Sequence, residues 1–151
     1  MRIVARVLAC AVAAVLLLPA AAGAAQPGAI PEPLDFGPFT VDGLCSFPVT
    51  LTFSGKTGVL ELPGDRVLET SPGLTGIYTN AADPSRTVTL NVTGTVIDQP
   101  SGLRTFNGRS VLATPDGLVL IVGTFTVSHE NGLDVILSGN GTRTPVCPMI
   151  G

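Results

Sequence analysis

The sequence has no tryptophan and only one tyrosine and one histidine among its 151 residues. With Tyr78 as its only tyrosine, the chain has few of the flat aromatic platforms that bind sugar rings, which argues against a carbohydrate-binding module. An ordinary zinc site needs several converging His or Cys ligands, and this chain offers His129 alone. We therefore expect no metal ion and no cofactor.

Basic residues are also scarce. The chain has 8 Lys and Arg against 11 Asp and Glu, a formal net charge of -3. Two of these basic residues, Arg2 and Arg6, lie in the first few positions, so the chain beyond them is more acidic still. A surface of this sign repels phosphate backbones, which excludes nucleic acid as a partner.

The N-terminal segment has the pattern of a secretory signal peptide. Arg2 and Arg6 precede an apolar run over 7–18, which is followed by a proline and small residues. We expect residues 1–25 to be removed, so that the mature protein begins near Gln26, is extracellular and retains no membrane span. The alternative is an uncleaved anchor, because the alanines extend the apolar segment toward the roughly 20 residues of a membrane span.

Three cysteines occur, and Cys10 lies within the expected signal peptide. The other two, Cys45 and Cys147, form an even pair in a chain bound for an oxidising compartment, so we expect a disulfide between them. Because Cys147 is close to the end of the chain, this bond would attach the C-terminus to the start of the folded domain. The sequence has no C-x-x-C spacing, which argues against a redox-active role.

From Cys45 onward the apolar residues recur with a period of two. In CSFPVTLTFS, Phe47, Val49 and Leu51 alternate with Pro48 and hydroxyl residues, which indicates a half-buried strand. Pro48 cannot donate to a sheet, so this strand should lie at an edge or begin there. Before it, residues 26–42 are rich in proline and glycine and predict a flexible arm, whose last third would be an edge strand if it docks.

Later segments continue the pattern. VLEL and RVLET flank a Pro-Gly-Asp turn, and strands are expected at LTGIYTN, SRTVTLNVTGTVID, RTFNGRSVLA, GLVLIVGTFTVS and GLDVILSG. Residues 43–151 therefore predict one all-β domain, an antiparallel β-barrel of about seven or eight strands, with a two-layer β-sandwich as the alternative. Gly94 and Gly123 in mid-strand indicate bulges or sharp bends.

Candidate chemistry is sparse. His129 stands near Glu130 and Asp134, and either carboxylate could orient it as a general base. The competing interpretation is a strand end followed by a polar turn, and no nucleophile motif accompanies the histidine. Glu61 and Glu69 could converge across the Pro-Gly hairpin as a glycosidase-like pair, although exposed hairpin carboxylates are commoner.

The segments CSFPVTLTFSGK, TSPGLTGIYTN and TLNVTG, with a single cysteine near the end, resemble a group of small secreted actinobacterial proteins of unknown function. The resemblance covers Cys45 to Cys147 and implies secretion and a β-rich fold with one disulfide. It assigns no site residue.

Three functions stay open on this basis. The first is a secreted, non-enzymatic β-barrel module that binds a small apolar ligand or a cell-envelope component. The second is a small barrel enzyme, an isomerase, cyclase or hydrolase, that uses His129 with Glu130 or Asp134. The third is an interaction or inhibitor protein that presents the loop at 71–74.

Overall fold

A computed structural model describes residues 30–151, and the chain there is an all-β domain, as predicted. The signal peptide expected over 1–25 and the start of the expected arm lie outside the described residues. The described elements are β1 (Glu32–Val41), β2 (Val49–Leu62), β3 (Arg66–Thr70), β4 (Thr75–Asn80), β5 (Thr87–Asn91), β6 (Gly94–Asp98), β7 (Leu103–Thr114), β8 (Gly117–Glu130), β9 (Leu133–Pro145) and the short helix α2 (Cys147–Ile150).

The strands form one antiparallel sheet in the order β5-β4-β2-β3-β6-β7-β8-β9, with β1 on the other side of β2. The length of β2 explains this order. Its first half, from Val49 to Ser54, pairs with β4, and its second half, from Gly58 to Leu62, pairs with β3. β2 begins directly after Pro48, as the missing donor of that residue predicts.

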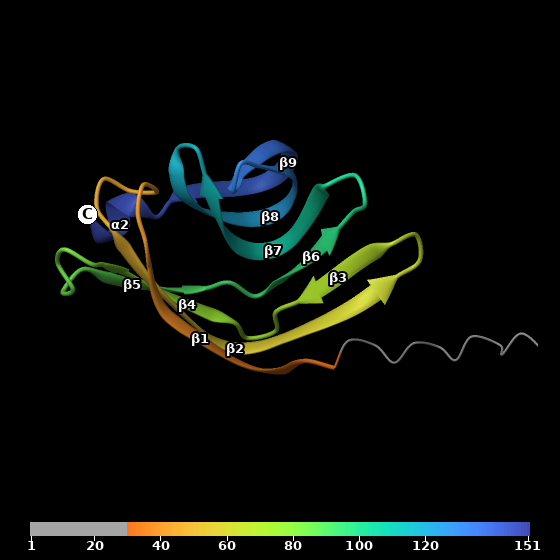
Figure 1. Cartoon of the computed structure of the whole chain (residues 1–151), viewed down its shortest axis with the longest axis horizontal. Helices are drawn as coiled ribbons and strands as arrows, with labels where there is room; N and C mark the ends of the chain where they lie inside the picture. The colour runs from red at the N-terminus through yellow and green to blue at the C-terminus, as the bar shows by residue number, and fades with distance from the viewer. Residues whose placement is uncertain (1–29) are drawn as a thin grey trace, which may run out of the picture.

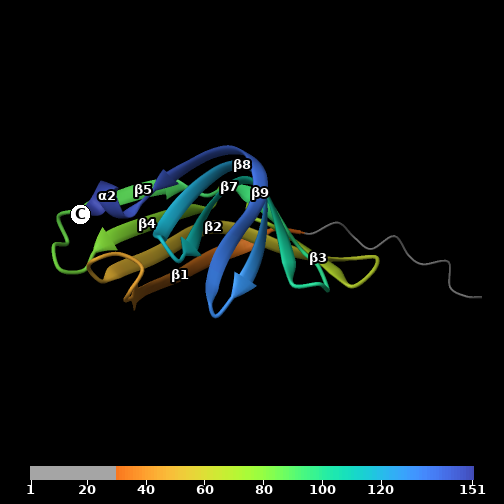
Figure 2. The ribbon, with the colours of Figure 1, turned by 90° about the horizontal axis from the view of Figure 1, so that it is seen from above.

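The predicted barrel is not confirmed. Among residues 30–151, no ladder joins β9 to β1 or to β5, so the sheet does not close. Instead, β7, β8 and β9 arch over the part of the sheet that contains β2 and β4 (Figures 1 and 2). This leaves an open, strongly curved sheet whose two halves face each other.

A row of four glycines crosses the half of the sheet that consists of β6, β7, β8 and β9. Gly94 lies opposite Gly108, Gly108 opposite Gly123, and Gly123 opposite Gly141. A Cβ on Gly94 would stand 2.8 Å from the Asn107 carbonyl oxygen, and one on Gly123 would collide with the carbonyl of Asn140. We call this line the glycine row. It agrees with the prediction that Gly94 and Gly123 mark a bend, because glycine alone permits so close a backbone approach.

The apolar core consists of two clusters, and the first of them joins the two halves of the sheet. In the first, Leu118 and Leu120 of β8 pack on Val49, Leu51 and Tyr78 of β2 and β4. The second lies on the other face of β7 and β8 and consists of Phe106, Leu112, Ile121, Phe125 and Val127. β8 is thus apolar on both faces because it separates two cores.

The arm predicted as flexible over 26–42 is a paired strand from Glu32 onward. Its aromatic side chains explain the difference. The ring of Phe39 lies 5.1 Å from that of Phe36 and 6.3 Å from that of Phe53, so the arm extends the aromatic packing of β2. Phe36 is 56% exposed, whereas Phe39 and Val41 pack against the first core, so the burial that offsets the entropy of ordering the arm comes from its last third.

The C-terminus is held at the edge of the first core. The predicted disulfide between Cys45 and Cys147 is present, with Cα atoms 5.6 Å apart. Ile150 is fully buried, and its carbonyl accepts a hydrogen bond of 3.1 Å from Nδ2 of Asn80. The guanidinium of Arg86 donates to the carbonyl of Gly151. The last turn of the chain is therefore a fixed part of the fold.

Candidate functional site

The sheet divides where β5 ends and β6 begins. The sequence predicts one strand over 85–98, but the chain leaves the ladder at Val92 and Thr93. The amide of Thr93 donates to Oδ1 of Asn91 at 2.9 Å, a local turn, while the amide of Val92 donates to the carbonyl of Leu74 at 2.9 Å. As a result β5 stays with β4, and β6 pairs with β3 and β7.

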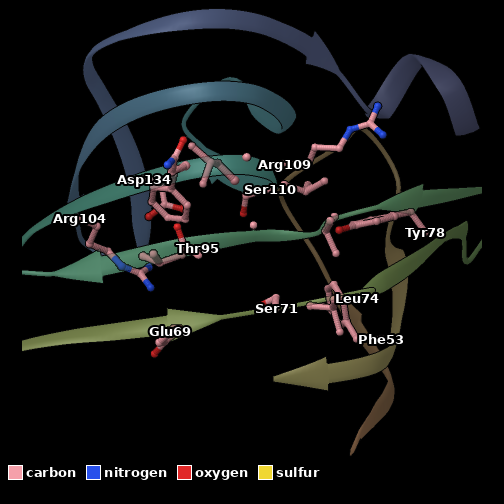
Figure 3. A pocket seen from close by; sticks show the side chains of 18 residues that line it. Phe53, Glu69, Ser71, Leu74, Tyr78, Thr95, Arg104, Arg109, Ser110 and Asp134 are labelled. Carbon is pink, nitrogen blue, oxygen red and sulfur yellow. The ribbon is translucent and has the colours of Figure 1, made fainter. Parts of the chain in front are cut away.

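A pocket of about 240 Å³ lies beside this division. Figure 3 shows that its lining has two different ends. The aromatic end includes Phe53, Leu74 and Tyr78, and the ionic end includes Glu69, Arg104 and Asp134. The pocket therefore offers both an apolar wall and charged groups to one small molecule.

Tyr78 dominates the aromatic end. The side chain is 2% exposed, and its ring lies over Gly76, where a Cβ would stand 2.8 Å from the ring. The ring of Phe53 meets it edge-on, with centroids 6.0 Å apart. Because Gly76 has no side chain, Tyr78 can lie along the strand and point its hydroxyl into the pocket (Figure 3).

The hydroxyl of Tyr78 has no hydrogen-bond partner among the described residues, and burial raises the pKa of the phenol well above its usual value. It is consequently a neutral donor at physiological pH. The hydroxyl is open to the pocket and is not sealed in the core, since Oγ1 of Thr93 is the one fully buried side-chain polar atom of residues 30–151 that lacks a partner. A water molecule or a ligand in the pocket can therefore accept its hydrogen bond.

Charged side chains from β3, β7 and β9 line the ionic end. Nε of Arg104 lies 2.6 Å from Oδ1 of Asp98, which stands directly opposite it in the β6–β7 ladder. The guanidinium also covers the ring of Phe106 at 5.3 Å. Glu69 is partly buried and forms no ion pair or hydrogen bond with the described residues. One carboxylate of the pocket is therefore left without a counter-charge.

The structure brings together only part of the predicted catalytic group. His129 and Asp134 are directly opposed, with Nδ1 and Oδ1 3.0 Å apart. Glu130 instead accepts a hydrogen bond from the hydroxyl of Ser128 at 2.9 Å. Asp134 is 8% exposed and lines the pocket, whereas the side chain of His129 is 50% exposed and lies outside the lining.

Sequence reasoning missed Tyr78 and Arg104 as site residues and placed Glu69 differently. Glu69 entered the sequence analysis only as a disfavoured pair with Glu61, and the hairpin register places Glu69 opposite Val59 and Glu61 opposite Val67. A usable signal did exist for Tyr78, since it follows Gly76 by two positions and so shares a strand face with a residue that has no side chain.

A second hollow, of about 420 Å³, also has Asp134 in its lining. Its lining includes Asp116, Ile136 and Arg143, and the guanidinium of Arg143 covers the ring of Phe125 at 5.2 Å. Asp134 thus contributes to the lining of both hollows. In residues 30–151 no group of three or more His, Cys, Asp or Glu could hold a metal ion, and no helix there is long and apolar enough to cross a membrane.

The loop at 71–74, expected as an inhibitor loop, connects β3 to β4 beside the pocket. The amide of Ser71 donates to the carbonyl of Gly94 at 2.9 Å, and Leu74 accepts from Val92. Ser71 and Leu74 line the pocket, while Pro72 and Gly73 are exposed. Both ends of the loop are therefore tied into the sheet.

No family model, curated protein or solved structure matches this chain.

Proposed function

We propose that this protein is a secreted, non-enzymatic module that binds a small molecule in the pocket beside Tyr78. The observation that carries the proposal is the hydroxyl of Tyr78, which opens to the pocket and has no hydrogen-bond partner among the described residues. The signal-like N-terminus, the disulfide and the resemblance to secreted actinobacterial proteins support the extracellular location. In this proposal the curved, unclosed sheet is an incomplete barrel.

The size of the pocket limits the ligand. Since one water molecule takes about 30 Å³ of liquid, roughly eight waters would fill the space, and a ligand of about ten non-hydrogen atoms fits. The sequence suggested an apolar ligand or a cell-envelope component. An amphipathic ligand suits the lining better, because the aromatic end and the ionic end belong to the same pocket.

An enzyme is the second candidate, and the contact of 3.0 Å between His129 and Asp134 favours it. The position of His129 outside the pocket lining weighs against this role. The two functions separate in the His129→Gln variant. If the protein is a binding module, this variant keeps its ligand affinity. If the protein is an enzyme, this variant loses turnover of the bound compound.

Native mass spectrometry of protein purified from its own culture medium tests the proposal directly. We expect a discrete mass above that of the chain, which disappears on denaturation. The Tyr78→Phe variant, which removes only the orphaned hydroxyl, should retain less of this mass. Equal native and denatured masses, together with Tyr78 ring resonances that no added compound shifts, would remove the support for a binding pocket.

A further inference from the structure

We infer that the ligand is a small organic cation, an amine whose ammonium group faces Glu69 and Asp134 and whose apolar body lies against Tyr78 and Phe53. This inference rests on the proposed function and names the chemical class of its ligand. Two independent observations carry it, namely the charge balance at the ionic end and the orphaned hydroxyl at the aromatic end.

Of the charged residues that line the pocket, Glu69 and Asp134 are negative and Arg104 and Arg109 are positive, and the ionic end has an excess of negative charge because neither guanidinium is free there. Arg104 is engaged by Asp98 at 2.6 Å, so its positive charge is already balanced. Asp134 has only His129 as a hydrogen-bond partner, and Glu69 pairs with no cation among residues 30–151. Inside a partly dehydrated pocket such an excess acts at a lower effective dielectric constant than in water, so it attracts a cation and repels an anion.

The other guanidinium of the lining does not offset this charge. Arg109 is exposed, and its side chain lies toward the aromatic end and points away from Asp134 and Glu69 (Figure 3). In water a charge of this kind is strongly screened. The ionic end therefore selects a cation with little competition from Arg109.

The aromatic end specifies the rest of the ligand. The rings of Tyr78 and Phe53 form an apolar wall, and the neutral hydroxyl of Tyr78 can donate one hydrogen bond. An oxygen acceptor on an otherwise apolar body satisfies that donor. The preferred ligand thus has an ammonium at one end and an ether, carbonyl or hydroxyl oxygen at the other.

Three probes of nearly equal size test this preference: 4-methoxybenzylamine, 4-methoxybenzyl alcohol and 4-methoxybenzoate. They share the ring and the methoxy acceptor and differ in the charge of the other end. Because the chain has a single tyrosine, the ring resonances of Tyr78 report on this pocket without labelling. We expect the amine to bind most tightly, the alcohol more weakly and the benzoate weakest, and we expect added salt to weaken only the amine.

Matched charge variants locate the effect. Glu69→Gln should weaken binding of the amine roughly five- to tenfold and leave the alcohol unchanged, as expected for one lost charge contact. Glu61→Gln removes the same charge from the neighbouring strand, outside the pocket lining, and should change neither. Tyr78→Phe, followed by calorimetry, should weaken the amine and the alcohol alike.

The outcomes separate the two levels of the proposal. If the alcohol or the benzoate binds as tightly as the amine, or if Glu69→Gln has no effect on the amine, the cation assignment is wrong while the pocket keeps its function. If none of the three probes shifts the Tyr78 resonances and the native mass equals that of the chain, the binding function itself fails.

Discussion

His129 and Asp134 face each other across the end of the β8–β9 hairpin because a short turn fixes them there. Asn131 and Gly132 form this turn with positive φ values of 53° and 82°. Asn-Gly is the preferred pair for a tight hairpin turn whose twist matches that of the strands. The contact of 3.0 Å between the two side chains is thus set by local sequence.

A double-mutant cycle should detect this contact. His129→Ala and Asp134→Ala, with the double variant, should give a coupling free energy of about 0.5–1.5 kcal/mol in urea unfolding. The corresponding cycle of His129→Ala with Glu130→Ala should show no coupling, since Glu130 bonds Ser128 instead. Equal coupling in both cycles would contradict the assignment of Asp134 as the partner of the histidine.

Alkaline pH should destabilise the protein through Tyr78. Burial raises the pKa of Tyr78 in the folded state above the value near 10 of the unfolded chain. The stability that belongs to the neutral phenol is therefore complete below about pH 10 and is lost as the pH rises toward the folded pKa. Phenolate absorbance should appear only together with unfolding. If Tyr78 ionises near pH 10 while the protein keeps the circular dichroism spectrum of the folded state, its pKa is not raised and this prediction is wrong.

A methyl group in the glycine row should be severely destabilising. Gly123 has φ 138°, and a Cβ there would meet backbone on the neighbouring strand, so Gly123→Ala should lower the free energy of unfolding by more than about 4 kcal/mol or prevent folding. Gly102 has φ 81° and open space around it, so Gly102→Ala should lose only about 1–2 kcal/mol. If chemical denaturation gives similar losses in the free energy of unfolding for both variants, the close backbone approach in the glycine row does not require glycine.

The penultimate residue should contribute like a core residue. Ile150→Ala should lower the free energy of unfolding by about 2–5 kcal/mol, because it leaves a cavity in a fully buried site. Met149 is 42% exposed, and Met149→Ala serves as the adjacent control, with an effect within about 0.5 kcal/mol. A frayed terminus would instead make both substitutions neutral.

Removal of the disulfide should also be costly. The bond between Cys45 and Cys147 closes a sequence separation of 102 residues, and in the chain-entropy model a loop of this size contributes up to about 4.7 kcal/mol. The double variant Cys45→Ser, Cys147→Ser should therefore unfold at a much lower urea concentration than the oxidised protein. The wild type with its disulfide reduced should behave like the double variant, and a loss below about 1 kcal/mol would contradict this account.

Local chemistry made part of the structure predictable. The period of two indicates the β class, Pro48 marks the start of β2, and the turn residues over 63–65 and 114–117 lie where two hairpins turn. The disulfide followed from the number of cysteines that lie outside the expected signal peptide. Each of these signals depends on a few neighbouring residues.

The division of the sheet was beyond such reasoning. Val92 and Thr93 keep the strand-like alternation, yet the ladder breaks there because β5 and β6 take different partner strands. The ionic end joins Glu69 of β3 to Asp134 of β9, and these strands are far apart in the sequence. A site of this kind depends on which strands pair, and single-strand periodicity carries no information on pairing.

The four glycines of the glycine row, one on each of β6, β7, β8 and β9, fix the register in which those strands pair. If any one strand slipped by a single residue, a side chain would stand where the backbones of Gly108, Gly123 and Gly141 come closest, and the mismatch would reject the slipped pairing. The glycine row that lets the sheet turn back on itself thereby couples the registers of the four strands to one another. No strand of the four can shift unless its neighbours shift with it.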